Sequence, residues 1–234
     1  TGTVGGATGP FEPVTGNSTT NNQDHGTTVT GGAVRTNPVT LGTPGDTTAN
    51  PDGTGTANLR QDFGFFRPLT LGNFVWTDAN NNGLFDTGEQ GIDGVVLRLL
   101  NGSGNPLLDA SNNPITTTTS GGGAYQFTNL VPGSYIVEVA ASNFAGSGPL
   151  VGLVSSTGTV GSLTGPFEPI TGNSTTNNQD HGSAVGGAVR TNAVTLAATG
   201  NPDAGGFANL RQDFGFFRPY QLGNRVWNDV NNDG

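Results

Sequence analysis

Five oxygen-bearing side chains and a glycine stand at a fixed spacing within residues 78–89. Counted from Asp78, the side-chain oxygens fall at positions 1, 3, 5, 9 and 12, and the glycine falls at position 6. Hard cations such as Ca²⁺ bind roughly six to eight oxygen atoms, and this spacing is that of an EF-hand calcium loop. The sequence therefore predicts a calcium site with ligands from Asp78, Asn80, Asn82, the backbone carbonyl of Leu84, Asp86 and Glu89.

An EF-hand loop joins two helices, but the segments on either side of this loop have the composition of β-strands. Residues 71–76 and 95–100 are rich in aromatic and aliphatic side chains, several of them β-branched. We therefore expect the loop to connect two strands, with Gly83 permitting its sharp turn. The alternative is a polar turn that binds no ion, because Asn and Gly are common in turns.

Three further segments, residues 124–127, 135–140 and 212–217, also have strand-like sequences separated by turns rich in Gly, Pro and Ser. No segment has the periodicity of an amphipathic helix, so we predict an all-β fold, an antiparallel β-sandwich. The stretches at residues 15–30 and 44–55 are expected to be ordered loops or decoration at a sheet edge. Alternation predicts that core faces include Tyr125, Phe127, Tyr135, Val137 and Val139, and we expect Trp76 to anchor the core.

The composition limits the possible functions of the chain. Of its 234 residues 32% are hydrophobic, with 40 glycines, 14 prolines and no cysteine, so no disulfide can form. The formal charge of −9 argues against nucleic acid as a partner and suits a surface that attracts divalent cations. No apolar run is long enough to span a membrane. The sequence begins with neither methionine nor a signal segment, and we expect it to be a processed or excerpted piece.

The second half of the chain repeats the first. Residues 15–26 return unchanged as residues 171–182, and residues 58–68 return as residues 209–219. Such identity indicates tandem duplication. We predict that residues 71–219 form one complete repeat, that residues 1–70 are the C-terminal part of a preceding repeat, and that residues 220–234 begin a following one. The chain would then be a window on a longer array, or a subunit whose ends neighbours complete.

Residues 71–95 resemble the opening of the SdrD-type B domains of SD-repeat proteins. Residues 123–139 are similar to later strands of that family, and residues 208–216 are similar to its closing strand. The resemblance implies tandem immunoglobulin-like, Cna-B-like β-sandwich repeats that bind Ca²⁺ and serve as stalks or spacers in bacterial surface adhesins. It also implies that Asp78, Asn80, Asn82, Asp86 and Glu89 are ligands, and that Asp229, Asn231 and Asp233 begin the next site.

The chain departs from many relatives of this sandwich in the residues available for crosslinking. Those relatives carry an internal Lys–Asn isopeptide crosslink, but this sequence contains no lysine. Mechanical strength must therefore come from strand pairing, calcium or packing between repeats.

Several weaker candidate sites lie outside the loop. Residues 21–26 and their copy at 177–182 form either a second cation-binding loop or an Asx turn, since each has one carboxylate. His25 and His181 each lack a second histidine in their own repeat, so a turn or surface role is favoured over metal binding. Asp62 and Asp213 have either an inward hydrogen-bonding role or a role as distant calcium ligands.

We expect a structural function, as a calcium-stiffened repeat of an extracellular stalk or fibre on a bacterial surface. Its partners would be neighbouring copies of the same repeat, in tandem or in a homopolymeric fibre. The alternative is an adhesin module that recognises a host protein or glycan. An enzyme is not expected, because the chain has no cysteine, one histidine per repeat and no paired acids outside the loop.

Overall fold

The computed structural model describes residues 3–4, 7–8, 24–28, 32–156, 159–160, 163–164, 177–224, 226–228, 230 and 233. Within them, two six-stranded sheets and three two-stranded ones account for the regular structure, with a single 3₁₀ turn at Ala141–Phe144 and no α-helix. The all-β prediction is confirmed. The same part of the chain holds no helix of the length and hydrophobicity needed to cross a bilayer.

The first large sheet is organised around β5, which is long and central and runs through the predicted strand at residues 71–76. It pairs antiparallel with β6 and β9 but parallel with β17 and β18, so the sheet is mixed rather than wholly antiparallel. The parallel pairs bring residues 208–217 beside residues 69–77, which are far away in the sequence. The strands are β5 (Leu69–Thr77), β6 (Gln90–Gly91), β9 (Ala124–Leu130), β11 (Val154–Ser155), β17 (Ala208–Asn209) and β18 (Phe214–Phe217).

The second large sheet is antiparallel and is centred on β10, which pairs with β7, β15 and β16. Its outer strands are β8, next to β7, and β14, next to β15. The predicted strands at residues 95–100 and 135–140 are both found here. The bounds are β7 (Val96–Asn101), β8 (Thr116–Thr118), β10 (Gly133–Val139), β14 (Ser183–Val185), β15 (Ala188–Arg190) and β16 (Val194–Leu196).

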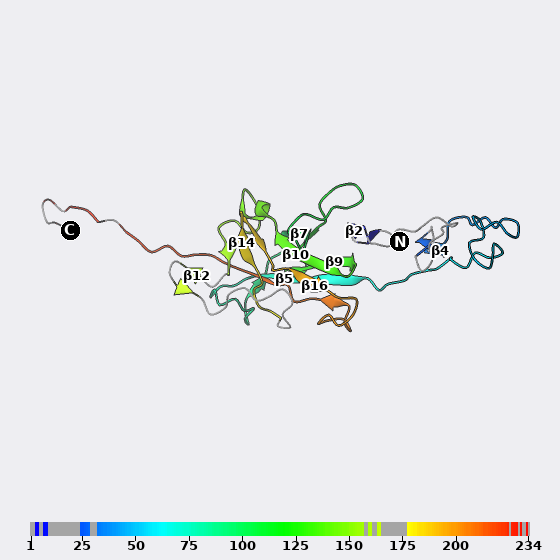
Figure 1. The fold of residues 1–234 in the computed structure, drawn as a ribbon. Helices are drawn as coiled ribbons and strands as arrows, with labels where there is room; N and C mark the ends of the chain where they lie inside the picture. Colours follow the sequence, from blue (N-terminus) through cyan, green and yellow to red (C-terminus); the bar gives the residue numbers. More distant parts are fainter. Residues whose placement is uncertain are drawn as a thin grey trace.

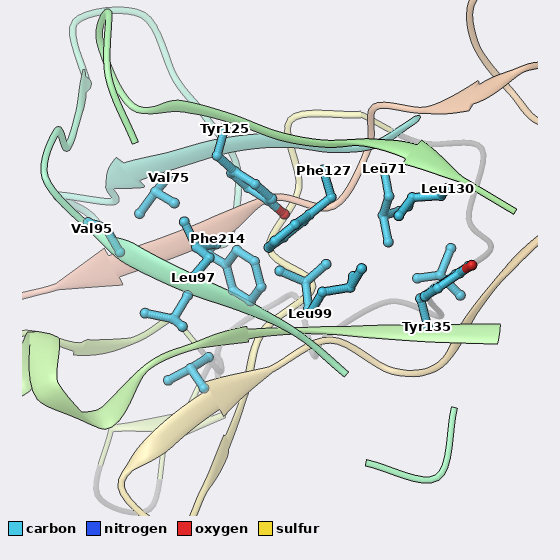
Figure 2. Packing of buried hydrophobic residues seen from close by; sticks show 14 of the residues in the cluster. Leu71, Val75, Val95, Leu97, Leu99, Tyr125, Phe127, Leu130, Tyr135 and Phe214 are labelled. Carbon is cyan, nitrogen blue, oxygen red and sulfur yellow. The ribbon is translucent and has the colours of Figure 1, made fainter. Parts of the chain in front are cut away.

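The hydrophobic core lies between these two sheets. Figure 2 shows Leu71 of β5 and Phe127 of β9 directed toward Leu99 of β7, and Phe214 of β18 packed in the same cluster. Burial of such faces is the main force that holds a sandwich together. The predicted core faces are confirmed, because exposure is 4% or less for Tyr125, Phe127, Tyr135, Val137 and Val139.

Trp76 does not anchor this core, contrary to our expectation. It is fully buried, but it faces away from the core, on the side of β5 opposite Val75, because successive strand residues point to opposite faces. Its ring lies 6.2 Å from that of Phe74 and 6.0 Å from that of Phe85, measured between centroids. Since Phe85 belongs to the predicted calcium loop, this aromatic cluster attaches the loop to β5.

Among its described residues, the first copy of the repeated sequence forms small elements outside the two large sheets. Its hairpin of β3 (Thr27–Thr28) and β4 (Val34–Arg35) corresponds to β14 and β15 of the second copy. Likewise β1 (Thr3–Val4) and β2 (Ala7–Thr8) pair as β12 (Thr159–Val160) and β13 (Leu163–Thr164) do. In Figure 1, residues 32–68 lie on one side of the sandwich and residues 218–224 extend from the other.

The loop predicted at residues 44–55 is found as a series of turns, whereas most of residues 15–30 lie outside the described residues. The division into repeats at residues 70 and 219 stays a prediction.

Candidate metal centre

The predicted calcium loop connects β5 to β6. Pairing of Trp76 with Gly91 and of Thr77 with Gln90 holds its two ends side by side. Three loop residues adopt positive φ angles, namely Asn81 at 54°, Gly83 at 74° and Gly88 at 99°. Asn and Gly tolerate this left-handed conformation, so the sequence at these positions fits the turns that the loop makes.

Asp78 is the organising side chain of the loop. It is fully buried, and its two carboxylate oxygens accept hydrogen bonds from the N–H groups of Asn82, at 3.1 Å, and Gly83, at 2.8 Å. Its own N–H donates to the carbonyl of Phe216 in β18, at 2.8 Å. The loop is therefore joined to β18 as well as to β5.

The two asparagines of the loop gather around Asp86. The side-chain N–H groups of Asn80 and Asn82 donate to the same Asp86 oxygen, Oδ2, at 2.9 Å and 2.7 Å. Their amide oxygens accept from the backbone N–H groups of Asn82 and Leu84, at 3.0 Å and 2.9 Å. Three of the predicted ligands thus converge, and each amide oxygen retains a lone pair because a carbonyl oxygen has two.

Glu89 closes the loop. Its carboxylate accepts the N–H of Ala79 on Oε1, at 2.8 Å, and the N–H of Asp86 on Oε2, at 2.9 Å. Both oxygens thus bind loop backbone, which directs the half-buried carboxylate toward the loop. A carboxylate in this position can present both oxygens to one cation, as the last ligand of an EF-hand loop does.

The oxygen donors of the loop fit a hard cation, although its carboxylates alone do not form a complete set of ligands. No three Asp, Glu or His side chains in the described part of the chain lie close enough to form a cage. The loop instead combines three carboxylates with two amide oxygens and a backbone carbonyl, all hard oxygen donors.

Residues 69–152, which contain the loop and β5 to β10, match the SdrD B-like domain family. This region is an SdrD B-like domain.

Relatives of the wider chain are serine-aspartate repeat-containing proteins. Protein D of Staphylococcus aureus strain Newman is 32% identical over 183 residues, which are 77% of this chain and 11% of that protein. Protein F of Staphylococcus epidermidis strain ATCC 12228 is 32% identical over 180 residues, which are 76% of this chain and 8% of that protein. The chain therefore spans about a tenth of the length of these curated relatives.

Residues 178–180 lie directly against the loop of the SdrD B-like domain, which sequence reasoning did not foresee. The N–H of Phe85 donates to the carbonyl of Asn178, at 2.9 Å, and the N–H of Asp180 donates to the carbonyl of Gly83, at 2.8 Å. These two bonds flank Leu84 and do not use its carbonyl, which belongs to the predicted ligand set. The one hint of this contact was that residues 177–182 had themselves been predicted as a weaker candidate cation loop.

Asp180 and Asp213 are buried beside this contact, and their pKa values reflect it. Burial, together with the charges of Asp78 and Asp213, raises the pKa of Asp180 well above its ordinary value. Burial also raises the pKa of Asp213 to about 8. His181 is buried as well, which lowers its pKa to about 4 and keeps the ring neutral near pH 7. Its Nδ1 lies 2.9 Å from the carbonyl oxygen of Gln179.

The second predicted calcium loop, which would begin at Asp229, cannot be described. Asp229 and Asn231 lie outside the described residues, so neither can be placed relative to Asp233. The segment that leads to them is exposed, with Leu222 at 106% and Val226 at 98% of full exposure. Their counterparts in β5 of the SdrD B-like domain, Leu71 and Val75, are fully buried.

Proposed function

We propose that this chain is a structural repeat of an extracellular stalk or fibre on a bacterial cell surface, made rigid by Ca²⁺ in the loop at residues 78–89. The observation that supports this best is the position of the loop. It contacts β5 and β6 at its ends, β18 through the Asp78 N–H, and residues 178–180 through Phe85. A cation in the loop would therefore stiffen a junction between the opening and closing parts of the repeat.

In this proposal the loop residues have distinct roles. The carboxylates of Asp78, Asp86 and Glu89 supply the formal negative charge of the loop, and Asn80 and Asn82 supply amide oxygens. The cation would take the place of the two amide N–H groups at Asp86 Oδ2, and the Leu84 carbonyl would complete the protein ligands. Mixed charged and neutral oxygens hold calcium with less self-repulsion in the empty loop than an all-carboxylate set.

The exposed phenylalanines of the first copy fit a structural role better than an adhesive one. Phe63 and Phe65 are 47% and 78% exposed, and alone they resemble a binding patch. Their copies Phe214 and Phe216 are fully buried in β18. A sheet from a neighbouring copy of the repeat would cover the first pair as β5 covers the second, so the partners we propose are neighbouring copies of the repeat.

The proposal predicts that calcium stabilises the sandwich. At free Ca²⁺ of about a hundred times Kd, binding adds about 2.7 kcal/mol, which for a chain of this size raises Tm by about 5–10 °C. Thermal unfolding with excess Ca²⁺ and with excess chelator measures this difference. Glu89→Gln should abolish most of the response, because it removes the carboxylate that closes the loop.

Asp109→Asn is the matched control. Asp109 also binds backbone N–H groups in a turn, those of Ser111 at 2.8 Å and Asn113 at 2.9 Å, but it lies outside the loop. This variant should keep the full calcium response. Identical melting curves with Ca²⁺ and with chelator would contradict the proposed function.

A further inference from the structure

Residues 63–66 are the first-copy counterpart of β18, and one side of this segment is built as it is in the second copy. Asp62, just before the segment, forms a parallel bridge with Asp24, and the N–H of Gly64 donates to Asp24 Oδ1 at 3.2 Å. The second copy has the same bridge, and its corresponding hydrogen bond is 3.1 Å long. The segment is therefore held in place from this side in both copies.

The other side of the segment differs between the copies. In the second copy β18 pairs in parallel with β5, so that Phe214 lies opposite Val75, and both side chains are fully buried. In the described part of the first copy, residues 63–66 belong to no sheet, and Phe63 and Phe65 are exposed. The first copy thus presents a prepared edge beside which no strand like β5 is found among the described residues.

A second copy of the β5 sequence lies on the other side of the sandwich. Residues 220–228 read Tyr-Gln-Leu-Gly-Asn-Arg-Val-Trp-Asn, whereas β5 reads Leu-Thr-Leu-Gly-Asn-Phe-Val-Trp-Thr. Their described part forms no strand, and Leu222 and Val226, whose counterparts in β5 are buried in the core, are almost fully exposed. In Figure 1 residues 218–224 extend away from residues 32–68, so the two segments of one molecule do not meet.

We propose that residues 220–228 of one molecule bind residues 63–66 of a second molecule, in the parallel pairing that joins β5 to β18. Asn228 would then lie opposite Phe65, because the corresponding residues of β5 and β18 are paired. This pairing rests on the proposed function in one respect, since it takes neighbouring copies of the repeat as the partners. It adds the two surfaces through which separate molecules meet.

The pairing would satisfy both segments. Val226 would lie opposite Phe63, so that two exposed apolar side chains are covered together. Backbone N–H and C=O groups along an open edge bind an added strand, which is a common mode of recognition between proteins. One strand covers few side chains, so each junction is weak and forms where copies are concentrated.

The resulting assembly would have a direction. The two surfaces differ in sequence and lie on opposite sides of the sandwich, so each molecule would use one surface for each neighbour. Such heterologous contacts build open head-to-tail filaments unless the rotation between copies closes a ring. Strand pairing between molecules would therefore lengthen a fibre by one sandwich at a time.

Crosslinking tests the pairing directly, because the chain contains no cysteine. Phe65→Cys and Asn228→Cys are prepared as separate proteins, mixed at high concentration and treated with a short thiol-to-thiol crosslinker. Intact mass spectrometry identifies the two variants in each covalent dimer. We expect mixed dimers to form at least about tenfold faster than with the control Leu41→Cys in place of Phe65→Cys, because pairing raises the local concentration of the two thiols. Leu41 is in the same copy and similarly exposed, at 67% against 78% for Phe65.

A second pair of variants tests the apolar contact. Val226→Asp, added to Asn228→Cys, should abolish the mixed dimer, because it places a charge opposite Phe63. Val230→Asp should leave the mixed dimer unchanged, since Val230 is also exposed but lies beyond the copy of β5. Equal effects of the two substitutions would overturn the proposed register.

Other outcomes separate this pairing from the proposed function. Equal crosslinking rates for Phe65→Cys and Leu41→Cys would overturn the pairing, as would a predominance of dimers that Phe65→Cys forms with itself. If Ca²⁺ still raises Tm in that case, the calcium-stiffened repeat stands and the strand pairing alone is wrong. Mixed dimers in a chain whose Tm ignores Ca²⁺ would support the pairing and contradict the calcium role.

Discussion

Glycine at position 72 is required by the close pairing of β5 with β9. A methyl group added there would overlap the carbonyl oxygen of Tyr125 and lie 3.0 Å from the Cα of Gln126, which are both backbone atoms. Gly72→Ala should therefore lower the free energy of unfolding by about 1–3 kcal/mol. Urea titration followed by tryptophan fluorescence measures the loss.

The repeated sequence supplies the control for this substitution. Gly223 occupies the same position in the second copy, and a methyl group there meets no described atom within 4 Å. Gly223→Ala should leave stability unchanged. An equal loss in both variants would show that helix or strand propensity, not the contact with β9, governs the effect.

Asp203 stabilises the turn before β17. It should make the free energy of unfolding depend on pH in the acid range. Partial burial raises its pKa, but the Arg211 guanidinium and the Leu210 N–H outweigh this and hold the pKa below the ordinary 3.8. A carboxylate whose pKa is lower in the folded than in the unfolded chain stabilises the folded state at pH values above its unfolded-state pKa. This stabilisation is lost as the pH falls through the folded-state pKa. Asp203→Asn should thus be less stable than wild type at pH 7, with the difference shrinking below about pH 4.

Denaturant titrations of both proteins at several pH values check this. Asp52→Asn is the control, because Asp52 makes the same ion pair with Arg60, at 2.9 Å, in the part of the chain outside the sandwich. That variant should not change the main unfolding transition. A difference at Asp203 that stays constant across pH would refute the electrostatic explanation.

Among the elements, β18 has the same sequence as a segment of the first copy, but it is buried whereas that segment is exposed. Phe214 is fully buried and its ring centroid lies 6.3 Å from that of Tyr125, whereas its copy Phe63 is 47% exposed. Phe214→Ala should cost about 3–5 kcal/mol of stability through lost burial and a cavity. Phe63→Ala should change stability by less than about 0.5 kcal/mol. Comparable losses in the two variants would mean that the first copy is also docked on a sheet.

Predictions from the sequence succeeded for elements whose pattern is local. The alternation in residues 135–140 and the strand at 71–76 are properties of a few neighbouring residues, so β10 and β5 were foreseeable. The orientation of Trp76 was missed because an apolar residue was assigned to the core without regard to the face that alternation gives it. Register between distant segments was not foreseeable either, since nothing local relates β18 or residues 178–180 to the predicted calcium loop.

The ligand spacing of the loop was a local pattern too, and the structure places it at a strand connection as expected. What the pattern could not reveal is that Asp180 and Asp213 become buried beside it. Their first-copy counterparts have the same neighbours in sequence but remain partly exposed. Burial depends on the whole repeat being closed, which is a property of tertiary structure rather than of the motif.

At the scale of the whole molecule, the segment before β5 is attached to the sandwich by a cation–π contact. The guanidinium carbon of Arg67 lies 4.3 Å from the ring centroid of Phe207, which precedes β17. Arg67 lies in the last part of the first copy, so this contact connects that copy to the sandwich that follows. In an array, such contacts would limit bending between successive repeats.

Phe207→Thr should loosen this attachment. Threonine stands at the corresponding position of the first copy, residue 56, so the substitution is one that the repeat itself uses. An exposed cation–π contact contributes about 0.5–1 kcal/mol, and its loss should make the segment detach about twofold to fivefold more often. Chymotrypsin cleavage after the exposed Phe65 and Phe66 measures this, with a correspondingly faster rate expected. Arg218→Ala, which alters the copy of Arg67, should leave that rate unchanged. An unchanged rate in Phe207→Thr would show that Arg67 does not restrain the segment.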